Sequence, residues 1–184
     1  MTKQIMRLAF IIIAICTLSS YRNVSIDKEP LINWSHDRKL TWEDFKGKPT
    51  ASKSNMLAVT CSNINFTYKH SKGLITNYEI KSVFIKDKSW TITSNLKALA
   101  HEQLHFDINE LYARKIRKSF DSLANKNNYL MENYIKVYNT YTVKRNRINR
   151  LYDTEVYGND IALKQWIKKI NNELEELDNY EEIE

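Results

Sequence analysis

A chain of 184 residues is long enough for one domain with a hydrophobic core and not comfortably for two. Its 28 Lys and Arg exceed its 22 Asp and Glu, but Lys3 and Arg7 lie in the opening segment, and without these two there are 26 basic residues against 22 acidic ones. This small excess argues against nucleic acid as a partner. With two cysteines, one of them Cys16 in the opening segment, a disulfide scaffold is excluded and packing must stabilise the fold.

Residues 1–20 have the organisation of a signal peptide, with a basic head, an apolar run from Leu8 to Leu18 and small polar residues after it. The apolar run has about 11 residues, whereas a helix that spans a membrane needs about 20. We therefore predict cleavage and export to the periplasm or the medium. Lipid attachment at Cys16 is an alternative that would anchor the protein to a membrane, although Ile15 stands where a lipoprotein signal has a small residue.

Two segments separate this opening from the predicted helices. Residues 21–55 contain both prolines and two of the four tryptophans, and we expect an irregular N-terminal arm that Trp42 and Phe45 anchor to the body. In residues 56–92, apolar and polar positions alternate on either side of a turn signal at residues 71–73. The alternation predicts antiparallel strands.

The stretch from Ser94 to Phe120 is predicted to be a long helix, because it lacks glycine and proline and has Ser94 as an N-cap. It contains the sequence His-Glu-Gln-Leu-His, from His101 to His105. Two histidines four residues apart lie on one helix face, so both imidazoles can bind one metal ion. Glu102 lies on the flank of that face, where its carboxylate can act as general acid and base on a metal-bound water. The pattern is typical of zinc metallopeptidases and predicts Zn²⁺ as the cofactor.

Further elements are expected after the long helix. They are a bend at residues 121–128, a helix over 129–152, a break over 151–160 that contains Gly158, a helix over 161–177 and an acidic tail, 179–184, extending into solvent. Residues 56–178 are therefore predicted to form a single α+β domain, in which a small antiparallel sheet packs on the long helix and two further helices.

Basic residues gather on the first two predicted helices. They are Arg114, Lys115, Arg117, Lys118, Lys144, Arg145, Arg147 and Arg150. Such helices can bind nucleic acid, but an exported protein rarely meets its own nucleic acid, so no nucleic-acid partner is predicted.

A catalytic zinc ion takes three protein ligands and keeps one open position, so His101 and His105 are not sufficient. The break over residues 151–160 offers Asp153, Glu155 and Tyr157 as further donors. Glu132 on the second predicted helix is another candidate, although no aspartate follows it four residues later.

Three strings of the sequence, HEQLHFDINELYAR, RKLTWEDFKGKP and YDTE, resemble a bacterial family of uncharacterised function described as predicted secreted zinc-dependent proteases. The resemblance extends from about Trp34 to Trp166. It implies a zincin-like fold, a peptide or protein substrate, zinc ligation by the two histidines and general acid/base catalysis by Glu102. In this family the Tyr-Asp pair precedes a Thr-x-His-Gly element whose histidine would be the third ligand. Here Tyr157 and Gly158 stand in its place, so Tyr157 or Glu155 is expected to substitute.

The sequence therefore predicts an exported zinc metallopeptidase, with one edge of its sheet beside the metal to receive an extended peptide. Two alternatives remain open. The protein could be a catalytically inactive zincin-like binding protein of the cell envelope. It could also be a helical scaffold without metal, with both histidines packed in the core beside Leu104 and Ile108.

Overall fold

The computed structural model of the chain describes residues 30–49 and 56–182. The predicted signal peptide, Cys16, much of the N-terminal arm and the last two residues of the acidic tail lie outside the described residues. No helix of the described part of the chain combines the length and the apolar character that a membrane span requires.

A three-stranded antiparallel sheet forms one layer of the fold, with strand order β1-β4-β3. Its strands are β1 (Leu31–Asn33), β3 (Ser62–Ser71) and β4 (Leu74–Ile85). Strands β3 and β4 form a hairpin with a two-residue turn at Lys72 and Gly73. Both residues have a positive φ, as in the tight turns whose twist matches that of the flanking strands. A second, two-stranded antiparallel sheet pairs β2 (Ala58–Val59) with β5 (Trp90–Thr91).

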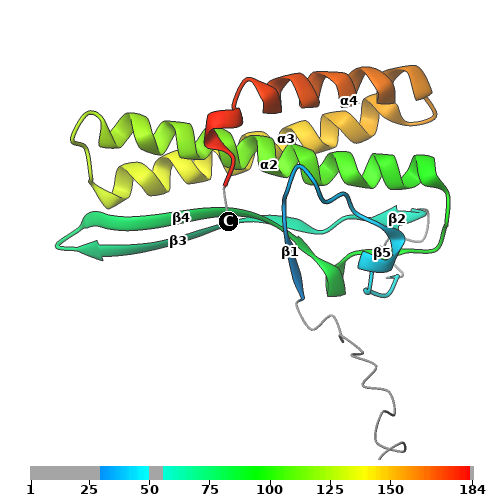
Figure 1. The fold of residues 1–184 in the computed structure, drawn as a ribbon, viewed down its shortest axis with the longest axis horizontal. Helices are drawn as coiled ribbons and strands as arrows, with labels where there is room; N and C mark the ends of the chain where they lie inside the picture. Colours follow the sequence, from blue (N-terminus) through cyan, green and yellow to red (C-terminus); the bar gives the residue numbers. More distant parts are fainter. Residues whose placement is uncertain (1–29, 50–55, 183–184) are drawn as a thin grey trace, which may run out of the picture.

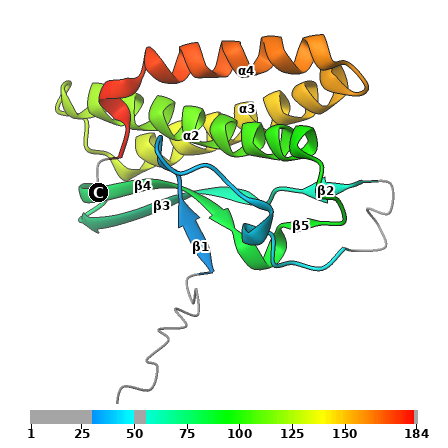
Figure 2. The ribbon, with the colours of Figure 1, turned by 45° about the vertical axis from the view of Figure 1, so that its right-hand side comes forward.

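Three helices cover one side of the sheet. They are α2 (Leu96–Ala124), α3 (Met131–Val156) and α4 (Asp160–Glu175). Helix α2 lies between the sheet and the other two helices and contacts β3, β4, α3 and α4 (Figures 1 and 2). This central position explains why its long side chains are almost fully buried, including Leu104, Ile108, Leu111, Ile116 and Phe120. The predicted α+β fold, with a small antiparallel sheet and three helices, is confirmed.

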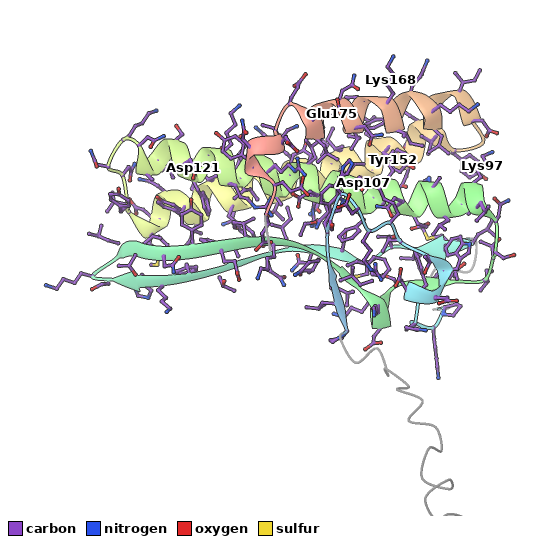
Figure 3. All side chains as sticks on the ribbon, in the orientation of Figure 1. Lys97, Asp107, Asp121, Tyr152, Lys168 and Glu175 are labelled. Carbon is purple, nitrogen blue, oxygen red and sulfur yellow. The ribbon has the colours of Figure 1, made fainter. Side chains whose placement is uncertain are left out.

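The beginning of α2 is set by Asn95 rather than by Ser94. The Asn95 side chain accepts hydrogen bonds from the backbone N–H groups of Lys97 and Ala98, and so caps two of the free donors at the helix start. Lys97 also forms an ion pair with Asp160 in the first turn of α4 (Figure 3). The starts of α2 and α4 therefore lie at the same end of the molecule.

Helix α3 is longer than predicted, because it continues to Val156 instead of ending near Tyr152. The break is confined to residues 157–159, where Gly158 has a positive φ of 65° and Asn159 caps α4. No glycine or proline interrupts the chain before Gly158, so the helix continues as far as it can. As a consequence, Asp153 and Glu155 lie on a helix and not in a loop.

The described part of the N-terminal arm is attached to the domain through aromatic residues. Phe45 packs edge-on against Trp42 and against Phe84 of β4, with ring centroids 4.9 and 5.1 Å apart. Trp34 donates a hydrogen bond of 2.8 Å from its indole N–H to Asp107 of α2. These contacts hold the arm against both the sheet and the central helix.

The acidic tail does not extend into solvent in its described part. Residues Asp178–Tyr180 form a short 3-10 helix, and Glu181 accepts a hydrogen bond of 2.6 Å from Arg114 of α2. The Arg117 guanidinium donates to the carbonyl oxygen of Tyr180. The expectation that the tail extends into solvent is therefore wrong for residues 179–182, because two arginines of α2 bind this segment.

Candidate metal centre

Helices α2 and α3 are antiparallel, and a row of polar residues follows the contact between them. Each step of four residues forward along α2 is matched by a step of four residues back along α3. The facing pairs are His101 with Asp153, His105 with Asn149, and Asn109 with Arg145. Because residues four apart lie on one helix face, two separate faces meet along this row.

Three side chains converge at the open end of the row. The Nε2 atoms of His101 and His105 lie 3.2 Å apart, and the Oδ1 atom of Asp153 lies 3.4 Å from the first and 2.9 Å from the second. These residues form a group whose ligand atoms all lie within 4.8 Å of one another. Two atoms that each lie about 2.1 Å from a tetrahedral ion are about 3.4 Å apart. The three donors therefore fit three of the four corners of a tetrahedral metal site.

The electrostatics of the triad are those of a carboxylate shared by two imidazoles. Burial raises the pKa of Asp153, but its hydrogen bonds to His101 and His105 hold that pKa well below its ordinary range. Burial lowers the pKa of His105, while its hydrogen bond to Asp153 and the charges of Asp153 and Glu102 raise it, with a net increase. A cation, whether a proton or a metal ion, is thus favoured between these groups. Zinc binding would displace that proton.

The ring of His105 is oriented by Asn149. Its Nδ1 atom lies 2.7 Å from Oδ1 of Asn149, whose amide nitrogen donates to the carbonyl oxygen of Arg145. That second bond fixes which amide atom faces the imidazole. The Asn149 oxygen can only accept, so in the neutral ring Nδ1 carries the hydrogen and Nε2 keeps its lone pair toward the triad.

Tyr152 supports both rings from the side of α4. It is fully buried, stacks on His101 with ring centroids 4.8 Å apart, and packs edge-on against His105 at 4.9 Å. Tyr152, which is labelled in Figure 3, donates a hydrogen bond from its O–H to the carbonyl oxygen of His101. Its ring packs edge-on against Trp166 of α4, with ring centroids 5.6 Å apart. Burial, followed by the charges of Glu102 and Asp153, raises its pKa, so the phenol stays protonated.

Glu102 lies on the flank of α2 that faces the small sheet. Its side chain is 5% exposed, and its Oε2 atom accepts a hydrogen bond of 2.7 Å from the backbone N–H of Thr60, which follows β2. The Thr60 hydroxyl donates to the Glu102 carbonyl oxygen. Among the described residues, no partner binds the other carboxylate oxygen, Oε1. One oxygen of this buried carboxylate is thus held by the protein, while the other is available.

The other predicted donors lie elsewhere. Tyr157 is 91% exposed at the end of α3, and Glu155 accepts a hydrogen bond of 2.8 Å from the indole N–H of Trp166, outside the triad. Glu132 is in the first turn of α3, and at 1.5 Å per residue it lies about 30 Å along the helix from Asp153. The structure thus places Asp153, and not Tyr157 or Glu155, opposite the two histidines.

Asp153 is one of the three donors that the sequence offered in this segment, and its spacing from Asn149 favours it over the other two. Asn149 and Asp153 are four residues apart, as are His101 and His105, so two matching polar pairs occur on two long predicted helices. This correspondence is lost when residues 151–160 are taken as a loop.

Comparisons with protein-family models, curated proteins and solved structures give no significant match to the chain.

Proposed function

We propose that this protein is an exported zinc-dependent peptidase with a zincin-like site, as the resemblance of its motif helix suggests. The observation that carries the proposal is the convergence of His101, His105 and Asp153 beside the buried carboxylate of Glu102. Two imidazoles and one carboxylate with an open fourth position are a donor set of catalytic zinc. A purely structural zinc site would be expected to have four protein ligands.

The residues of the site divide the chemistry between them. His101, His105 and Asp153 would hold the zinc, which when bound lowers the pKa of a water molecule and polarises a carbonyl group. Glu102 would accept a proton at Oε1 and pass it to the leaving amine. The Thr60 N–H keeps the Glu102 carboxylate in one position, which limits the rearrangement needed during proton transfer.

Among the described strands β2 pairs with β5 alone, and its other edge, beside Glu102, suits a peptide substrate. The N–H of Ile92 donates to the carbonyl oxygen of Leu57, so the backbone groups of Leu57 and Val59 point toward β5. Because successive residues of a strand alternate in the direction of their backbone groups, the backbone groups of Ala58 and Thr60 point away from β5. The Thr60 N–H reaches Glu102 on that side. An extended peptide could add to β2 along this edge, with its backbone next to the general base.

Purified protein and its Glu102→Gln variant test the proposal. We expect about one zinc per chain in both proteins, and hydrolysis of an unstructured protein substrate by the native chain alone. Removing a general base costs about 10² to 10⁴ in rate. Glu132→Gln, the same chemical change at the far end of α3, should leave zinc content and rate unchanged.

The outcomes separate the competing functions. Unchanged hydrolysis by Glu102→Gln would contradict the assigned role of Glu102. Protein that binds zinc but hydrolyses nothing would support the inactive binding protein. Protein that neither contains zinc nor is stabilised by it would be a scaffold, and the proposal would be wrong.

A further inference from the structure

Arg145 differs from the other partly or fully buried arginines of the fold in its partners. Arg114 and Arg117 on α2 both bind the carboxylate of Glu110, and Arg114 also binds Glu181. Arg145 on α3 forms no ion pair with any carboxylate among the described residues, and its hydrogen bonds go to amide and carbonyl oxygens. Burial lowers the pKa of its guanidinium. A charged group removed from water without a counter-ion is costly unless an anion joins it.

The two edges of the Arg145 guanidinium have different surroundings. One edge points inward, where Nη1 donates to Oδ1 of Asn109 at 2.6 Å and to the carbonyl oxygen of Ser62 at 3.4 Å. The other edge, Nε and Nη2, points outward, and the partner it meets among residues 30–49 and 56–182 is Oδ1 of Asn146, at 3.2 and 2.8 Å, in an exposed position. This outer pair of N–H groups is the fork that binds a carboxylate through two parallel hydrogen bonds.

The outer edge of Arg145 lies on the same flank of the molecule as the metal triad. Asn146 and Asp153 are seven residues apart on α3, which places them on one side of the helix and about 10 Å apart. In the segment that joins β2 to β3, Thr60 contacts Glu102, and Ser62, the first residue of β3, contacts Arg145. Residues two apart are at most about 7 Å apart along the chain. An extended peptide covers 7 to 10 Å with about two or three residues.

We propose that Arg145 binds a carboxylate of the substrate, two or three residues from the scissile bond. The inference rests on the proposed peptidase function and specifies its substrate class, peptides with an acidic side chain or a C-terminal carboxylate at that distance. Asn146 occupies the fork in the free protein and is replaced by the carboxylate. The inner edge stays bound to Asn109 and Ser62, so the guanidinium needs little rearrangement.

Matched peptides and three variants test this inference. A peptide series carries Glu, Gln or Lys at each position up to four residues on either side of the bond that is cleaved. Binding to zinc-loaded Glu102→Gln protein is measured by fluorescence anisotropy, and hydrolysis is measured with the native chain. At one position, two or three residues from the bond, Glu should bind about tenfold or more tightly than Gln, as expected for a charge-assisted pair. Arg145→Gln should abolish that difference, and Arg145→Lys should retain part of it.

Arg147→Gln is the matched control, because it removes an exposed arginine from the same helix and should leave the preference intact. Circular dichroism and zinc content establish that each variant is folded. Hydrolysis without preference for Glu at any position, or a preference that survives Arg145→Gln, would overturn the inference and leave the peptidase function standing. Binding of the acidic peptide without hydrolysis would support the inference and contradict the function. If the protein neither binds the acidic peptide nor hydrolyses any peptide, the inference and the peptidase function are both wrong.

Discussion

The assignment of Asp153 as the third ligand makes the sharpest prediction. Its Oδ1 atom lies 2.9 Å from Nε2 of His105 and 3.4 Å from Nε2 of His101, so Asp153→Ala removes the only donor that closes the triad from α3 among the described residues. Losing a residue that merely supports a ligand weakens metal binding by about 10- to 100-fold. Losing a ligand should therefore weaken zinc binding by more than about 100-fold.

A 100-fold loss of zinc affinity also predicts a smaller increase in Tm when zinc is added. At zinc concentrations about 100 times the native Kd, binding stabilises the folded state by about 2.7 kcal/mol, and a 100-fold weaker site leaves about 0.4 kcal/mol. For a domain of this size, those energies correspond to increases in Tm of about 5–10 °C and about 1–2 °C. Without zinc, Asp153→Ala should change Tm little, because the Asp153 side chain is 53% exposed and solvent screens its pairing with the histidines.

Chelator competition and calorimetry with and without zinc measure both quantities. Glu155→Ala and Tyr157→Phe are the matched controls, since both residues were candidate ligands and neither belongs to the triad. Each should keep zinc affinity within about threefold of native, whereas loss of a residue that supports a ligand weakens binding by about tenfold or more. Asp153 is not the third ligand if Asp153→Ala binds zinc as tightly as the native chain, or if Tyr157→Phe loses zinc.

Two further predictions concern the support of the site and the alkaline limit of the fold. Asn149→Leu should weaken zinc binding by about 10- to 100-fold. Asn149→Asp keeps an acceptor for Nδ1 of His105, so its zinc affinity should stay within about tenfold of native. Equal losses of affinity in chelator competition would show that this hydrogen bond does not support the site. Burial raises the pKa of Tyr78, Tyr112 and Tyr134 above its ordinary value near 10. The unfolded chain then loses protons that the folded chain keeps, so stability should fall as the pH rises above 10, with a slope of at most about 1.4 kcal/mol per pH unit for each tyrosine. Urea unfolding at increasing pH measures how steeply the free energy of unfolding falls. A fall above pH 10 that Tyr112→Phe leaves unchanged would contradict the raised pKa of Tyr112.

The parts of the fold that were predictable depend on local patterns. Alternation and the Lys72–Gly73 turn indicated the β3–β4 hairpin, and helical spacing placed His101, Glu102 and His105 correctly relative to one another. These features depend on residues within one turn or one strand pair. The composition of the chain between Gly73 and Gly158 was likewise sufficient to predict long helices.

The third ligand was not predictable in the same way, because it depends on the register between α2 and α3. Shifting α3 by one turn along α2 would place Asn149 opposite His101 and move Asp153 beyond the triad. That register is fixed by the turn between the helices and by contacts such as the packing of Phe120 against Tyr134, with ring centroids 4.6 Å apart. Neither is visible as a local pattern.

The surroundings of the basic residues of α2 were likewise not predictable from a local pattern. Arg114 is 1% exposed and bound by Glu110 and Glu181. Helix α2 is covered by the sheet on one side and by α3, α4 and the tail on the others, so even its polar face is largely enclosed. The basic residues of α2 therefore carry no information about partners, since the protein neutralises much of their charge internally.

The polar row between α2 and α3 is difficult to explain by stability alone. Two packed helices gain most from apolar contacts, and replacing buried polar groups with apolar residues of similar size is often neutral or stabilising. Elsewhere this fold follows that rule, with Phe120 and Tyr134 meeting along the same helix pair. Toward the other end, the pair instead places His105 against Asn149 and Asn109 against Arg145. Both members of each pair are hydrogen-bonded, and the row joins the two sites that we propose, the metal triad at one end and the carboxylate site at Arg145 two turns away. A peptide that crosses both sites would have its scissile bond fixed by the carboxylate that Arg145 holds, which is why substrate selection and chemistry are expected to depend on the same helix pair.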